Sequence, residues 1–94
     1  MVDSTNNLAR RALDAWGENA QIDMAIEECA ELITALMDRR RGRGGDNAVA
    51  KEIADVEIML EQLRIVIGKE RCFDALLSKW NRLEQRLDAR LDSK

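Results

Sequence analysis

Five carboxylates stand at spacings that place them on neighbouring turns of two helical segments. Glu27, Glu28 and Glu31 lie in the segment AIEECAEL, and Glu52 and Asp55 follow after twenty intervening residues. Like charges three or four residues apart on a helix repel one another, and burying an unpaired carboxylate is costly or forces it to take up a proton. The pattern therefore indicates either a solvated face or a bound positive charge.

Helical periodicity argues against a plain solvated face. At about 100° per residue, the three acids of the first segment share an arc with Ala and Met residues. In the second segment, Glu52 and Asp55 project into an apolar stripe, whereas Glu57, Glu61 and Arg64 take the outward positions. The stripe comprises Ala48, Val49, Ile53, Val56, Met59, Leu60, Leu63, Val66 and Ile67. A solvated surface does not predict two acids on such a stripe.

In an antiparallel helix hairpin, the pair Glu28 and Glu31 could face the pair Glu52 and Asp55. Four carboxylates meeting inside a bundle need a cation, and hard oxygen ligands favour Mg²⁺ or Mn²⁺ over zinc or iron. The chain has no His, so it cannot form the Glu-x-x-His sites of di-iron bundles. The alternative is that each acid forms an ion pair with Lys or Arg across the bundle.

The elements that must position these acids are helices. The 94 residues are consistent with a single domain, 1–94, and the absence of Pro and the abundance of Ala, Leu, Glu and Arg favour helix nearly throughout. Gly17 ends a short first helix that Ser4 or Asp3 can cap. Longer helices are expected over residues 19–41, capped by Asn19, over residues 47–67, capped by Asp46 or Asn47, and over residues 70–91. The sequence predicts an all-α, four-helix bundle with a short first helix.

Charge and hydropathy exclude several classes of function. A net charge of −3 does not suggest a general binder of nucleic acid or of a membrane surface. The basic run RRRGR, residues 39–43, is explained by arginines that complement a helix dipole, with a nucleic-acid accessory role as the alternative. No apolar run approaches the roughly 18 residues of a membrane span, so a cytoplasmic protein is expected. Because so short a chain buries limited surface, self-association is also expected.

Read in order, EExxE followed by ExxD resembles the signature of the MazG-like, all-α nucleoside triphosphate pyrophosphohydrolases. Trp16-Gly17 and Gln21 before the first motif, and the run EIADVEIMLEQL around the second, are also similar. The resemblance covers roughly residues 16–87. It implies hydrolysis between the α and β phosphates to give a nucleoside monophosphate and pyrophosphate, in the clearing of unwanted nucleotides. It also implies dependence on Mg²⁺, with Mn²⁺ able to substitute, and a homodimer or homotetramer.

The resemblance also implies roles for individual residues. Glu28, Glu31, Glu52 and Asp55 would hold the metal, and Glu27 would orient or deprotonate the attacking water or help to hold a second metal.

Positive and aromatic side chains are candidates for substrate contact. Lys79, Arg82 and Arg86 share one stripe of the expected fourth helix, and Arg can bind phosphate through two parallel hydrogen bonds. The alternative is a solvated flank paired with nearby acids. Trp16 could stack on a nucleotide base, with packing in a core or an interface as the alternative.

A competing hypothesis is a noncatalytic helical oligomerisation or interaction module. The apolar residues of the fourth helix follow a heptad-like spacing, so this helix could bind a partner helix. They are Leu76, Trp80, Leu83 and Leu87.

Overall fold

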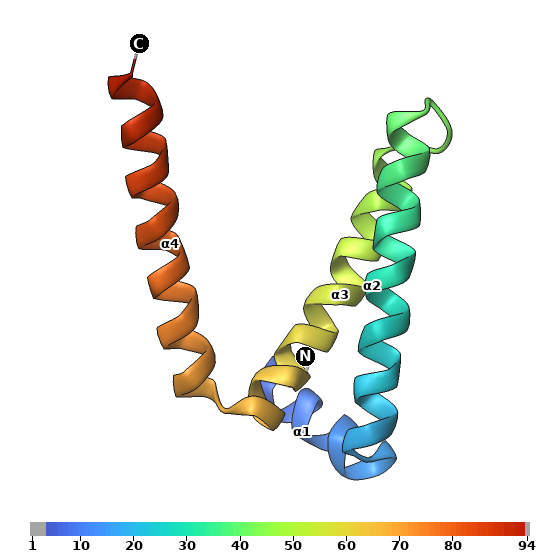
Figure 1. The fold of residues 1–94 in the computed structure, drawn as a ribbon. Helices are drawn as coiled ribbons and strands as arrows, with labels where there is room; N and C mark the ends of the chain where they lie inside the picture. The colour runs from blue at the N-terminus through green and yellow to red at the C-terminus, as the bar shows by residue number, and fades with distance from the viewer. Residues whose placement is uncertain (1–3, 94) are drawn as a thin grey trace.

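The computed structural model describes residues 4–93, which form four helices and contain no strand (Figure 1). The helices are α1 (Thr5–Trp16), α2 (Glu18–Arg40), α3 (Asp46–Ile67) and α4 (Lys69–Asp92). The predicted all-α class, the number of helices and the short first helix are therefore confirmed. Within the same residues, no helix combines the length and the apolar character that crossing a bilayer requires.

The start of α1 agrees with its predicted cap. The Ser4 side chain accepts a hydrogen bond from the backbone N–H of Asn7 at 3.2 Å, which satisfies one of the free donors of the first turn. Asp3, the other candidate cap, lies outside the described residues. At the other end of α1, Gly17 adopts φ 90°, a conformation that side chains other than Gly rarely adopt.

The predicted caps of α2 and α3 are wrong. Gly17 and Gly45 occupy these positions without a side-chain cap, and Asn19 and Asn47 lie inside the helices. Asp46 is instead the first residue of α3, where it accepts a hydrogen bond from Arg39 Nε at 2.6 Å. This exposed ion pair bridges the loop between the two helices, so the carboxylate is used across the loop and not for capping.

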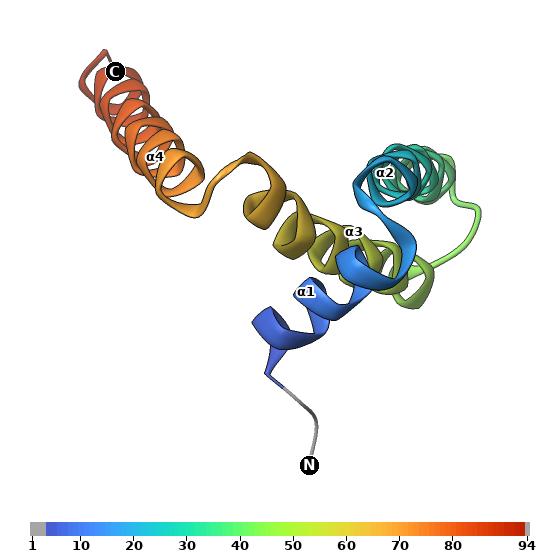
Figure 2. The ribbon, with the colours of Figure 1, turned by 90° about the horizontal axis from the view of Figure 1, so that it is seen from below.

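Helices α2 and α3 form an antiparallel hairpin, and α1 packs across its end opposite the loop (Figures 1 and 2). The small core contains Ala9, Ala25, Val49 and Met59. It also contains two polar side chains, Gln21 at 7% and Gln62 at 3% exposure, and Gln21 Nε2 donates to Gln62 Oε1 at 2.6 Å. This bond satisfies part of the polarity that burial would otherwise leave unpaired.

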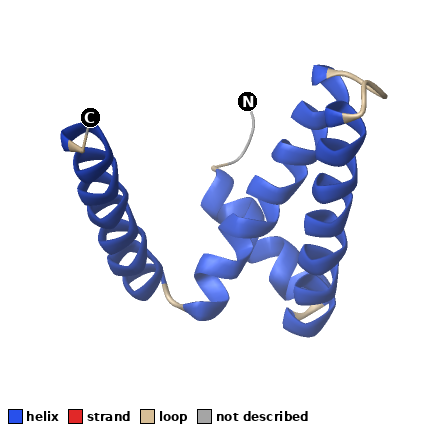
Figure 3. Ribbon diagram, turned by 45° about the horizontal axis from the view of Figure 1, so that its top comes forward, coloured by secondary structure: helices blue, strands red, loops and turns tan. Residues whose placement is uncertain are grey.

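Helix α4 leaves this three-helix body almost at once. Gly68, at φ 117°, is the single residue between α3 and α4. Beyond a hydrogen bond from Lys69 to Asn6, α4 packs only against α3, and none of its residues is buried. It points away from the hairpin in every view (Figures 1, 2 and 3).

The expected bundle of four helices is therefore not closed within one chain. The Cα radius of gyration is 16.7 Å, whereas a compact domain of this length would have about 12 Å. Three helices pack together and the fourth extends from them.

Candidate functional site

The hairpin register places the motif acids of α2 and α3 at the same level. Glu28 lies two helical turns after Gln21 on α2, and Asp55 lies two turns before Gln62 on α3. Because the helices are antiparallel and the two glutamines are hydrogen-bonded, Glu28 comes level with Asp55. One turn further toward the loop, Glu31 comes level with Glu52 by the same argument.

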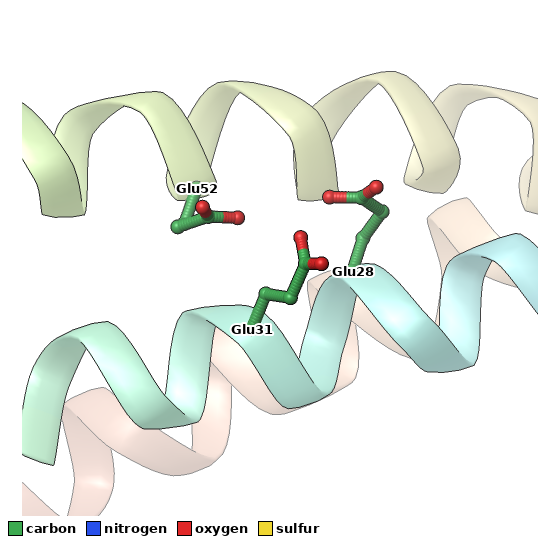
Figure 4. A group of neighbouring side chains, drawn as sticks. All are labelled: Glu28, Glu31 and Glu52. Atoms are coloured by element: carbon green, nitrogen blue, oxygen red, sulfur yellow. The ribbon is translucent and has the colours of Figure 1, made fainter.

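Three of these carboxylates gather in the gap between the two helices. Glu28, Glu31 and Glu52 each offer an oxygen, and these oxygens all lie within 4.8 Å of one another. Figure 4 shows Glu28 and Glu31 reaching from α2 toward α3, with Glu52 reaching from α3 between the helices. We call these three residues the acid cluster.

The acid cluster has no positive partner in the part of the chain that the structure describes. Glu28 and Glu52 are half-buried, and the Oε2 atom of each is buried without a hydrogen-bond partner. The ion pairs that Arg39 and Arg64 form are with Asp46 and Glu61. Neutralisation of each acid by its own Arg or Lys, the alternative that the sequence left open, is therefore not observed for residues 4–93.

Burial and repulsion between neighbouring acids alter the protonation of Glu28 and Glu52. Removal from water raises the pKa of Glu28 to about 7, and repulsion from Glu31 and Asp55 acts in the same direction. Burial, followed by repulsion from Glu31 and Asp55, also raises the pKa of Glu52. In both cases the charged form is disfavoured because residues 4–93 supply no compensating charge.

The remaining two motif acids lie beside the cluster. Asp55 is exposed and is not one of the three acids whose oxygens are mutually close, although its charge acts on both Glu28 and Glu52. Glu27 is exposed as well. The sequence thus indicated more acids than the geometry gathers at one point.

The candidate substrate contacts lie on other elements. Trp16, 69% exposed, ends α1 and lines a groove between α1 and α3. Lys79, Arg82 and Arg86 are exposed on α4, which diverges from α2 and α3 (Figure 3). One chain therefore does not bring these three side chains to the acid cluster, and their substrate roles stay predictions.

The buried pair of glutamines is the element of the site that sequence reasoning missed. A signal was present, because Gln21 precedes Glu28 by seven residues and Gln62 follows Asp55 by seven. Two helical turns return to nearly the same face, so these glutamines share the faces that carry the acids. Polar residues repeating along one line of each helix predict a polar seam between the helices.

Comparisons of the chain with protein-family models, with curated proteins and with solved structures find no match.

Proposed function

We propose that the chain is a Mg²⁺-dependent nucleoside triphosphate pyrophosphohydrolase, which cleaves the bond between the α and β phosphates. The observation that carries this proposal is the acid cluster, in which two helices direct three carboxylates at one another without a basic partner among residues 4–93. The resemblance of EExxE and ExxD to the MazG-like signature supplies the reaction. An acid cluster alone is common on protein surfaces, so the proposal rests on the geometry and the motif together.

The donor set suits Mg²⁺. The oxygens of the acid cluster lie within 4.8 Å of one another, whereas oxygens bound to one Mg²⁺ at about 2.1 Å lie at most about 4.2 Å apart, so binding would draw the carboxylates closer together. The buried, unpaired oxygens of Glu28 and Glu52 would gain a partner. Glu28, Glu31 and Glu52 would hold the ion, with Asp55 at the edge. When bound, Mg²⁺ neutralises acids and phosphates and polarises phosphorus–oxygen bonds.

The other residues of the site would act on water and on the substrate. Glu27 is exposed next to Glu28, where its carboxylate could orient the attacking water or accept its proton. Lys79, Arg82 and Arg86 would bind phosphate oxygens, and Trp16 would stack on the base. Because α4 diverges from the acids of its own chain, a second copy would have to bring these cations to the substrate.

The test is an assay of canonical and modified nucleoside triphosphates with Mg²⁺, scored for monophosphate and pyrophosphate. Glu31→Gln should lower turnover at least about a hundredfold, beyond the 10–100-fold effect typical of residues that only support a ligand. Glu18→Gln, on an exposed residue of the same helix, should leave it unchanged. Calorimetry should show Mn²⁺ binding that Glu31→Gln weakens and Glu18→Gln does not.

Two results would reject the proposal. Release of orthophosphate and a nucleoside diphosphate would place the cut at the β–γ bond. Absence of both turnover and Mn²⁺ binding from a folded chain would leave the acid cluster without a metal role.

The second candidate function is a noncatalytic interaction module, which the bare face of α4 favours. Leu76, Trp80, Leu83 and Leu87 are all exposed although they share one side of the helix. This function predicts no metal binding, and it predicts that charges placed on these residues abolish association.

A further inference from the structure

Helix α4 carries an apolar stripe that no described residue of its own chain covers. The stripe comprises Phe73, Leu76, Leu77, Trp80, Leu83, Leu87 and Leu91, each at least 49% exposed. Exposed apolar surface of this extent on a soluble domain marks an interaction surface. A lone amphipathic helix also gains most of its stability from packing, so α4 needs a partner.

The chain cannot supply this partner by folding α4 back onto its own hairpin. Antiparallel helices that pack side by side are joined by loops of about 2–5 residues, whereas Gly68 alone joins α3 to α4. The Gly68 N–H bonds to the Arg64 carbonyl, and Lys69 bonds to Asn6, so both sides of the joint are held. Short hinge loops of this kind favour exchange of an element between copies.

The three-helix body offers a groove of the right chemistry. The groove has a volume of about 1000 Å³ and lies between α1 and α3. Its apolar lining residues include Leu8, Ala12, Trp16, Ala54, Ile58 and Leu60. Amphipathic helices bind to grooves of this composition through residues spaced three and four apart.

Charges at the groove match the flanks of α4. Glu57, Glu61 and Arg64 lie on the α3 wall, where Arg64 forms an ion pair with Glu61 at 3.3 Å, and Arg11 lies on the α1 wall. At about 100° per residue, the apolar stripe of α4 is bordered by a basic flank on one side and an acidic edge on the other. The basic flank is Lys79, Arg86 and Arg90. On the other side Asp88 borders the stripe, and Glu84 lies within its edge between Phe73 and Leu77. One orientation therefore sets the basic flank beside Glu57 of the α3 wall and the acidic edge along the α1 wall.

The exposed area agrees with a missing copy of the chain. The accessible surface is 7756 Å², whereas a compact monomer of this mass would expose about 5,500 Å². The excess of roughly 2,000 Å² per chain is more than the ~800 Å² per partner of a standard interface and falls in the range of obligate homodimers.

We infer that the groove between α1 and α3 binds α4 of a second copy, and that two chains exchange their last helices reciprocally. Each groove then receives the helix that its own chain cannot return to it. The groove is on the α1 side of α3 and the acid cluster is on the α2 side, so this inference stands without the proposed enzymatic function, and its tests use no nucleotide or metal. In the exchanged dimer Lys79 and Arg86 lie along the groove, so contact between these cations and a substrate at an acid cluster would involve a further copy of the chain.

Sedimentation equilibrium over a range of concentrations tests the exchange. The native chain should be a dimer or a multiple of it, and Leu83→Glu should raise the dimer dissociation constant by about thirtyfold or more, as for a central interface residue. Gln85→Glu adds the same charge to the opposite side of α4 and should change the dimer dissociation constant little. Ile58→Glu in the groove should act like Leu83→Glu, whereas Ile33→Glu, on an equally exposed isoleucine of α2, should not.

Mixing provides a sharper test. The Leu83→Glu chain keeps a native groove, and the Ile58→Glu chain keeps a native α4. In a mixed dimer the native α4 can bind to the native groove, so the mixture should contain more dimer than either variant alone. Four Gly-Ser residues inserted after Gly68 should let α4 reach its own groove and convert the dimer into a compact monomer.

Circular dichroism on every variant distinguishes dissociation from unfolding. A native chain that is monomeric at all concentrations would overturn the inference. A dimer that neither Leu83→Glu nor Ile58→Glu dissociates would also overturn it. So would a dimer that Ile33→Glu dissociates, or one that remains a dimer after four residues are inserted following Gly68.

Discussion

At the scale of single residues, Glu28 has the most informative surroundings. Its side chain is half-buried beside Glu31 and Glu52, and one of its oxygens is buried without a partner. A carboxylate in this position remains stable by taking up a proton or by binding a cation. Its protonation therefore reports on the acid cluster even before any ligand is known.

The raised pKa of Glu28 predicts that the metal-free chain becomes less stable as the pH rises. The folded pKa is about 7 against an ordinary value of 4.5, so the folded state binds more protons than the unfolded state between these limits. Stability from this group is complete below about pH 4.5 and is lost as the pH rises through about 7. Urea unfolding in a chelator at pH 5.5 and pH 7.5 measures this difference.

Two variants identify the source of the pH dependence. Glu28→Gln cannot titrate and should reduce the loss of stability between the two pH values. Glu18→Gln should retain it. An unchanged pH dependence in Glu28→Gln would mean that the acid cluster is not strained in solution.

At the scale of elements, the sequence predicted the hairpin well because its signal is local. Helical periodicity and the glycines give the bounds of α2 and α3 to within one or two residues, and the same periodicity indicated that Glu52 and Asp55 turn toward the neighbouring helix. The caps were harder to predict, since an Asp or Asn near a helix start can lie just inside the helix, as Asp46 does. Which acids meet depends on the register of two helices, which a single segment does not determine.

The hydrogen bond between Gln21 and Gln62 predicts a nonadditive pair of substitutions. Gln21→Leu or Gln62→Leu alone should cost about 1–3 kcal/mol, because each leaves a buried amide unpaired. The double variant should cost clearly less than the sum of the two, since two leucines pack without polar atoms. Chemical denaturation of the four chains completes this double-mutant cycle.

The control for this cycle is Gln85→Leu, on an exposed residue of α4, which should change stability by no more than about 0.5 kcal/mol. Additive effects of the two buried substitutions would show that the glutamines do not set the register. The double variant should also bind Mn²⁺ more weakly if the register positions the acid cluster.

At the scale of the whole molecule, the sequence predicted helix α4 but not its surroundings. The spacing of Leu76, Trp80, Leu83 and Leu87 predicts an interaction surface on this face, and it contains no information on whether the partner belongs to the same chain. That Gly68 alone connects α3 to α4 becomes clear only when the last residue of α3 and the first residue of α4 are known. The expected closed bundle failed for this reason, although every helix in it was predicted.

The single-residue joint at Gly68 also has a consequence for how the protein acquires its structure. Helices α1, α2 and α3 are neighbours in sequence, so their assembly is a first-order process whose rate is independent of dilution. Burial of α4 in another chain requires a collision, and this late phase should be second order, with a half-time that shortens in proportion as the chain concentration rises. Stopped-flow refolding can be followed by tryptophan fluorescence, to which Trp16 in the groove and Trp80 on α4 both contribute. A tenfold dilution series should separate the two phases, and a late phase whose rate is independent of dilution would contradict exchange between chains.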